Sequence, residues 1–66
     1  MGALYEMKVA IEAKIKADGL DAVATKGQIG LRTGRLFSFI NPSTPDDPES
    51  IAKFRAAAKD ILKLSL

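Results

Sequence analysis

Apolar residues recur with helical spacing at both ends of the chain, and the stretch between is less regular. Near the N-terminus they repeat at steps of three and four residues, the spacing of one buried helix face. Gly19 follows this repeat and is a typical helix stop. The pattern predicts a helix over residues 3–18, with the apolar stripe at Leu4, Met7, Ile11 and Ile15.

The C-terminal repeat begins with a clear start signal. Asp47 is placed to cap a helix, Pro48 suits the first helical position, and Glu49 brings negative charge to the first turn. These residues predict a helix over residues 48–63. Its buried stripe would consist of Ile51, Phe54, Ala58, Ile61 and Leu62.

The central stretch predicts two shorter helices. Asp21 can cap a helix over residues 20–26, which Gly27 would end. A second helix over residues 32–40 would stop at Asn41, because the residue before a proline is disfavoured in helical geometry. It would bury one face through Leu36, Phe39 and Ile40, which are spaced i, i+3 and i+4.

Together these patterns predict an all-α fold, a single small four-helix domain over residues 1–66 with a helix-turn-helix-like centre. The predicted helices would pack through a shared core formed by Ile11, Ile15, Val23, Leu36, Ile40, Phe54 and Ile61.

An α+β fold is the alternative, with a two-stranded β-hairpin over residues 28–40 between two helices. Thr33-Gly34 would form the turn. This pairing places Arg32 opposite Arg35, and like charges directly across a ladder are destabilising. It also leaves Phe37 and Phe39 on an uncovered face, so we favour the helical interpretation.

Composition excludes several kinds of site. A chain of 66 residues buries only about 60% of the surface of its unfolded form, so small domains often rely on disulfides, metals or oligomerisation. This chain has no cysteine and no histidine, which excludes disulfides and the usual zinc sites. It also lacks the commonest nucleophiles and general bases. We therefore expect no enzyme activity and no cofactor, and we keep homo-oligomerisation open.

The hydropathy pattern also bears on location. No apolar run approaches the roughly 20 residues that cross a bilayer. Lys8 and Glu12 interrupt the N-terminal segment, where a signal peptide would be apolar. We expect a cytoplasmic protein without a membrane partner.

The positive charge is concentrated in the centre of the chain. The net charge is +2, but residues 22–45 carry Lys26, Arg32 and Arg35 and no acidic residue, while the remaining seven basic and eight acidic residues sum to −1. A local basic excess is what phosphate contact requires. A solvated surface explains three cations equally well.

Residues 30–61 resemble the helix-turn-helix headpiece of the lac repressor family. Gly30-Leu31 resembles its turn, and Asp47-Pro48-Glu49-Ser50 resembles the capped start of its closing helix. Further residues of both regions also follow the headpiece pattern. They are Leu36, Phe39, Ile40 and Asn41 in the recognition helix, and Phe54, Ala56, Ala57, Asp60 and Ile61 in the closing helix.

This resemblance implies a module that binds duplex DNA through a basic recognition helix. Side chains on the outward side of such a helix contact phosphates and base edges, and others lie at the motif turn. The implied contacts are Arg32, Thr33, Arg35 and Ser38 on the helix, with Lys26 and Gln28 at the turn.

A small protein-interaction or oligomerising module is the alternative function. Its partner would be a second copy or another protein, and its contacts would be Phe37, Leu64 and Leu66. Fold alone does not choose between the two functions.

Overall fold

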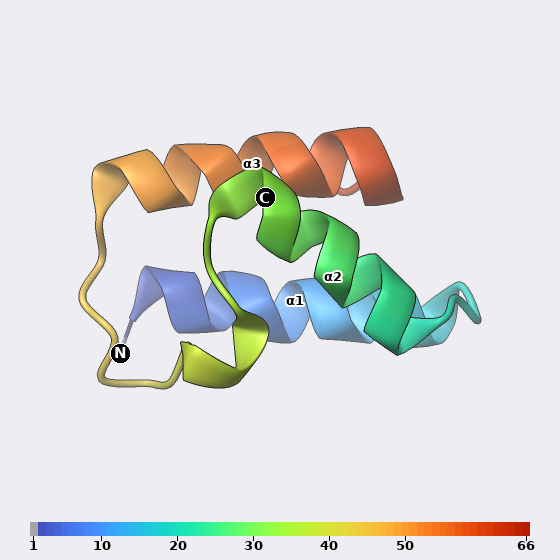
Figure 1. The fold of residues 1–66 in the computed structure, drawn as a ribbon, viewed down its shortest axis with the longest axis horizontal. Coiled ribbons are helices and arrows are strands. Elements are labelled where there is room, and N and C mark those ends of the chain that lie inside the picture. Colours follow the sequence, from blue (N-terminus) through green and yellow to red (C-terminus); the bar gives the residue numbers. More distant parts are fainter. Residues whose placement is uncertain (1) are drawn as a thin grey trace.

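Three α-helices and one turn of 3-10 helix make up the computed structural model, which describes residues 2–66. The helices are α1 (Ala3–Ala17), α2 (Ala22–Thr33) and α3 (Pro48–Leu62), and the 3-10 turn is η1 (Phe37–Phe39). In Figure 1, α1 and α3 lie side by side and run in the same direction, and α2 returns obliquely across their front. All three helices pack against one another.

The all-α prediction is therefore confirmed, but the four-helix count and the helix-turn-helix centre are wrong. The hairpin alternative is also wrong, because residues 28–32 lie inside α2 and the described part of the chain contains no strand. The prediction misplaced the end of α2. The helix continues through Gly27 to Thr33 and ends at Gly34, whose φ of 71° is left-handed.

Gly34 also explains why residues 32–40 do not form a helix. Its amide donates to the carbonyl oxygen of Gly30 at 2.8 Å, which closes the last turn of α2. The hydroxyl of Thr33 donates to the carbonyl oxygen of Ile29 at 2.9 Å. The chain then leaves in an extended conformation at Leu36, so only the three residues of η1 return to helical geometry.

The first and last helices agree with their predicted extents. Asp47 caps α3 by accepting the amide of Glu49, and Pro48 occupies the first turn. At the other end, Lys63 adopts a left-handed φ of 57° and closes the helix. In α1 the predicted stripe of Leu4, Met7, Ile11 and Ile15 is buried.

The core lies between the three helices and is completed by η1. The phenyl rings of Phe37 and Phe54 lie 5.8 Å apart, centroid to centroid. Of the seven predicted core residues, Val23 and Leu36 are exposed and Ile61 is half-buried, whereas the other four are buried. The buried apolar residues are Leu4, Met7, Ile11, Ile15, Ile29, Phe37, Ile40, Phe54, Ala57, Ala58 and Leu62.

A long-range hydrogen bond caps the start of α1. The N-cap residue Gly2 has no side chain to accept a hydrogen bond. Instead, Oδ1 of Asp46 accepts the amide of Leu4 at 3.2 Å, from the loop that precedes α3. The backbone amides of Ala3 and Leu4 lower the pKa of the Asp46 carboxyl below its ordinary value of 3.8. The hydroxyl of Ser50 is the main cause of a lowered pKa at Asp47.

These lowered pKa values predict the acid response of the protein. A carboxyl with a lower pKa in the folded state stabilises the fold above its unfolded pKa, and this stabilisation is lost as the pH falls through the folded pKa. Stability should therefore decline below about pH 4, the unfolded value for aspartate. Asp46→Asn keeps an acceptor for the cap but removes the titrating charge. We expect this variant to take up fewer protons on unfolding than the wild type, by up to about one proton. The pH dependence of the melting temperature between pH 2 and pH 6 measures this difference.

Asp18→Asn is the matched control, because Asp18 forms an exposed i,i+4 ion pair with Lys14. The variant removes an aspartate without touching a long-range cap. An acid response of Asp46→Asn as steep as that of the wild type would contradict the assigned role of Asp46.

Candidate interaction surface

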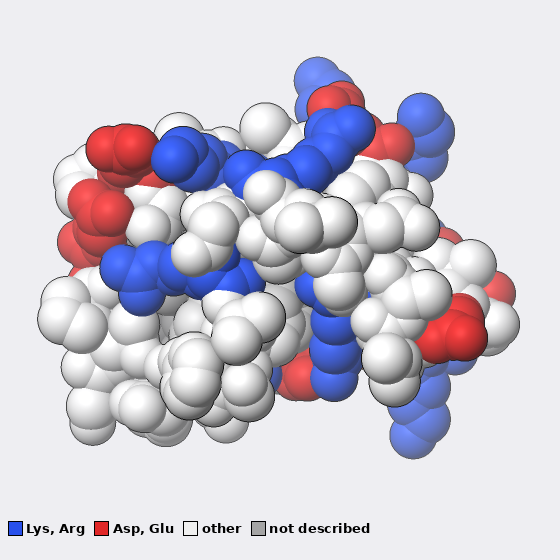
Figure 2. Space-filling view, in the orientation of Figure 1, with Lys and Arg blue, Asp and Glu red and all other residues white. Residues whose placement is uncertain are grey.

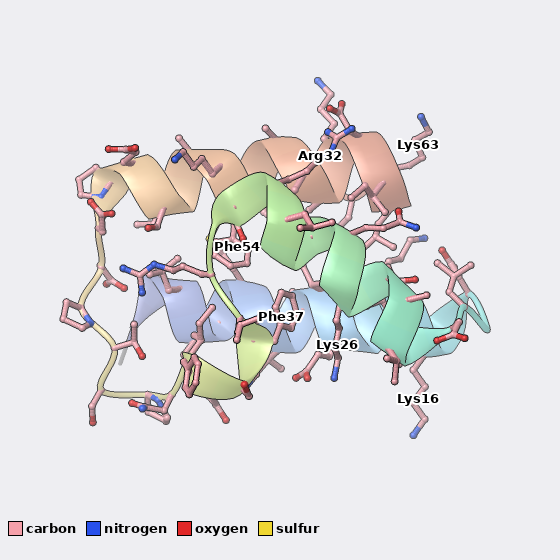
Figure 3. All side chains as sticks on the ribbon, in the orientation of Figure 1. Lys16, Lys26, Arg32, Phe37, Phe54 and Lys63 are labelled. Atoms are coloured by element: carbon pink, nitrogen blue, oxygen red, sulfur yellow. The ribbon has the colours of Figure 1, made fainter. Side chains whose placement is uncertain are left out.

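Two of the three central cations are held in ion pairs with other helices. Nζ of Lys26 lies 2.8 Å from a carboxylate oxygen of Glu12 on α1. Nη1 of Arg32 lies 2.7 Å from a carboxylate oxygen of Asp60 on α3. Figure 3 shows the two side chains leaving α2 in opposite directions. They therefore link α2 to both neighbouring helices instead of sharing one basic surface.

The third cation belongs to a polar network at the start of α3. Nε of Arg35 donates to the hydroxyl oxygen of Ser50 at 3.0 Å. That hydroxyl donates in turn to Oδ2 of Asp47 at 2.9 Å. Thr33, another predicted DNA contact, is buried. Gln28 and Ser38 are exposed, so the six predicted contacts do not converge on one helix face.

The residues predicted for a protein interface are also engaged within the fold. Phe37 is buried against Phe54. Leu64 and Leu66 are half-buried and pack against the core. The C-terminal tail is held further because Nε of Arg55 donates to the carbonyl oxygen of Leu66 at 3.1 Å.

The largest exposed apolar side chains lie elsewhere, on α2 and the segment that follows it. Val23 is 85% exposed, Leu31 88%, Leu36 59% and Phe39 73%. The buried stripe of α2 consists of Thr25, Ile29 and Thr33, and at 100° per residue Val23 and Leu31 fall away from it. We call the following set the outer face: Val23, Gly27, Gly30, Leu31, Gly34, Leu36 and Phe39.

Two adjoining shallow grooves connect the outer face from Gly27 to Phe39, and Val23 lines neither of them. One is lined by Gly27, Gly30, Leu31, Gly34, Arg35 and Leu36. The other shares Gly34, Arg35 and Leu36 with it and extends to Phe39 and Ile40. The view of Figure 2 looks onto α2 and the segment after it, where broad uncharged areas lie between and beside basic side chains.

The glycines of α2 carry no side chain, so the backbone itself forms part of this surface. Apart from the neighbouring backbone of its own helix, a Cβ added at Gly27 would have no heavy atom within 4 Å, whereas one at Gly30 would lie 3.2 Å from the carbonyl oxygen of Arg35. Internal packing therefore gives no reason for glycine at position 27. A glycine inside a helix costs about 1 kcal/mol relative to alanine.

Sequence reasoning missed the outer face because it ended the helix at Gly27. Once α2 is extended to Thr33, Val23 and Leu31 lie on the side opposite Ile29, and the sequence shows two different apolar stripes on one helix. A continuous helical repeat across the glycines was the signal that could have revealed it.

Other kinds of site receive no support from the described residues. Residues 2–66 include no cluster of three or more Asp and Glu side chains arranged to hold a metal ion. Within the same residues, no helix has the length and apolar character needed to span a bilayer.

The sequence and the fold were compared with models of protein families, with curated proteins and with solved structures, and none of them matches this chain.

Proposed function

We propose that the protein is a cytoplasmic protein-interaction module that binds another polypeptide against its outer face. One observation carries this proposal: four large apolar side chains on α2 and the segment after it are between 59% and 88% exposed, and three of them, Leu31, Leu36 and Phe39, line two adjoining grooves. Large exposed apolar patches on small domains mark sites of interaction.

The energy available from this face is comparable in size to the cost of association. Fully burying a Val, Leu or Phe side chain contributes roughly 1.5–3 kcal/mol, so four would contribute on the order of 6–12 kcal/mol. Association costs about 4–15 kcal/mol in lost translational and rotational freedom. We expect moderate affinity that changes little with salt, because the contacts are apolar.

Duplex DNA binding remains the competing hypothesis. It requires phosphates to replace the carboxylates that pair with Lys26 and Arg32. If about three phosphates were bound per protomer, log affinity would fall with log salt with a slope of about −2.7. Titration of labelled duplex at low and moderate salt measures this slope. The interaction proposal expects no such binding.

Site-specific photocrosslinking tests the proposal directly. A benzoylphenylalanine at position 39 replaces one exposed aromatic side chain with another on the outer face. In cells that make the protein, we expect a discrete protein adduct from this position that disappears when Leu31→Glu is added. The same group at position 16, where Lys16 points away from α2 (Figure 3), should give none.

Absence of a protein adduct from position 39, or an adduct that survives Leu31→Glu, would overturn the proposal. An adduct that is sensitive to nuclease would favour the DNA hypothesis. Leu31→Glu should leave the fold intact, because the side chain of Leu31 is 88% exposed.

A further inference from the structure

The residues after α3 turn back and run along the same helix. Figure 1 marks the end of the chain beside the middle of α3. There, Nε of Arg55 donates to the carbonyl oxygen of Leu66, which is 11 residues further along the chain. Leu64 and Leu66 are half-buried and pack against the core. We call residues 64–66 the strap.

Two hollows adjoin the strap, and Arg55 and Leu66 line both of them. The first hollow reaches α1 at Met7. The second follows α3 past Ala56 and Lys59. Because the same leucine lines both hollows, lifting the strap would join them into one groove on α3 and α1, which we call the strap groove.

The strap is held by contacts that can be exchanged. The amide of Leu64 donates to the carbonyl oxygen of Ala58 at 3.2 Å, and the hydrogen bond from Arg55 to Leu66 is exposed to solvent. Lys63, which turns the chain, has a left-handed φ of 57°, a conformation that favours glycine. Segments with exposed hydrogen bonds and few buried contacts open locally while the rest of the protein stays folded.

We infer that the strap is an autoinhibitory segment, and that the strap groove binds an extended peptide with two leucines two residues apart and an acidic residue between them. The strap itself shows the leucine part of this pattern, because Leu64 and Leu66 are the side chains that pack there. This surface shares no residue with the outer face, and the inference does not rest on the proposed function.

Charge at the strap groove indicates the acidic residue. Arg55, Lys59 and Ser65 line the same hollow. None of the ion pairs among residues 2–66 involves Arg55 or Lys59. A peptide with a carboxylate at the position of Ser65 therefore brings its negative charge to two cations that have no carboxylate partner, and such complementarity favours one partner over others.

The strap competes with a free peptide because it is part of the chain. A short tether holds a segment near its site at an effective concentration of the order of millimolar. When only a fraction of the molecules has an open groove, the apparent dissociation constant rises by the inverse of that fraction. Releasing the strap should therefore tighten peptide binding, and holding it more firmly should weaken binding.

Fluorescence anisotropy with the full chain tests the inference. The probe is a labelled peptide of sequence Lys-Leu-Asp-Leu, blocked at both ends. Leu66→Ser removes the leucine that lines both hollows, and we expect this variant to bind the probe at least about tenfold more tightly than the wild type. Adding Arg55→Glu should abolish the gain. A peptide with lysine in place of the aspartate should bind more weakly than the probe.

Two further measurements locate the binding and keep the fold intact. The methyl resonance of Met7, which lines the first hollow, should shift when the probe binds to Leu66→Ser. Ser65 is exposed, so its substitution should not disturb the core. We expect Ser65→Lys to loosen the strap by repulsion from Lys59 and to bind the probe more tightly than the wild type, and Ser65→Asp to bind it less tightly.

The inference fails if Leu66→Ser, shown to be folded by circular dichroism, does not bind the probe. It fails equally if binding leaves the Met7 resonance unchanged, or if the peptides with aspartate and lysine bind alike. Should Leu66→Ser not fold, equal affinities of Ser65→Lys and Ser65→Asp for the probe would refute it. None of these measurements involves position 39, so each outcome leaves the proposed function to its own test.

Discussion

Replacing Phe54 with alanine is expected to lower the free energy of unfolding by roughly 3–5 kcal/mol, the range for large aromatic truncations in a core. Phe54 is 1% exposed and its ring packs against that of Phe37. The ring packs between α3 and η1, so its removal opens a cavity between these elements. The loss is comparable to the whole net stability of a domain this small, about 3–5 kcal/mol.

Chemical denaturation of Phe54→Ala, with Phe39→Ala as a matched control, measures the effect. Both changes remove a phenyl ring, but Phe39 is 73% exposed, and surface substitutions usually stay within about 0.5 kcal/mol. Equal denaturation midpoints for the two variants would show that the packing of Phe54 is not as described.

Ile29→Ala is expected to have the next largest effect, about 2–5 kcal/mol. Ile29 is completely buried and is the only large apolar side chain that α2 contributes to the core. Leu31→Ala, two residues along the same helix, should change stability by less than about 0.5 kcal/mol. The pair tests the orientation of α2, because a helix rotated by half a turn would exchange the two results. Thermal unfolding measures both.

The sequence was sufficient to predict α1 and α3 because their signals are local. An apolar repeat defines each buried face, and Asp47, Pro48 and Gly19 mark helix ends through their own backbone and side-chain chemistry. The Asp47-Pro48-Glu49-Ser50 part of the repressor resemblance has the same local origin. The recognition-helix part has no counterpart, since Leu36 is extended and only residues 37–39 form a turn.

The extent of α2 could not be predicted because its glycines look alike in sequence. Gly27, Gly30 and Gly34 each disfavour a helix, yet the first two lie inside α2 and only Gly34 adopts the left-handed conformation that ends it. Burial of Ile29 against the other helices offsets the weak local propensity, and such tertiary contacts are invisible to a local pattern. The same error placed Phe37 outside the core and Val23 inside it.

The surface was harder to predict than the fold, because its chemistry depends on partners distant in the chain. Arg32 and Asp60 are 28 residues apart in sequence, so nothing near Arg32 indicates that its charge is paired. The outer face depends equally on the correct register of α2. The sequence identifies the cations and the leucines, but only the packing shows which of these side chains remain exposed and unpaired.

The Asp46 cap on α1 has a consequence for how the chain folds. Its acceptor lies 42 residues beyond the amide of Leu4, so the first turn of α1 acquires its cap only after the loop before α3 has come back to the N-terminus. An isolated α1 of 15 residues would be marginal in water. Local helix formation and long-range closure are thus a single event, which favours all-or-none folding over stepwise assembly of three independent helices.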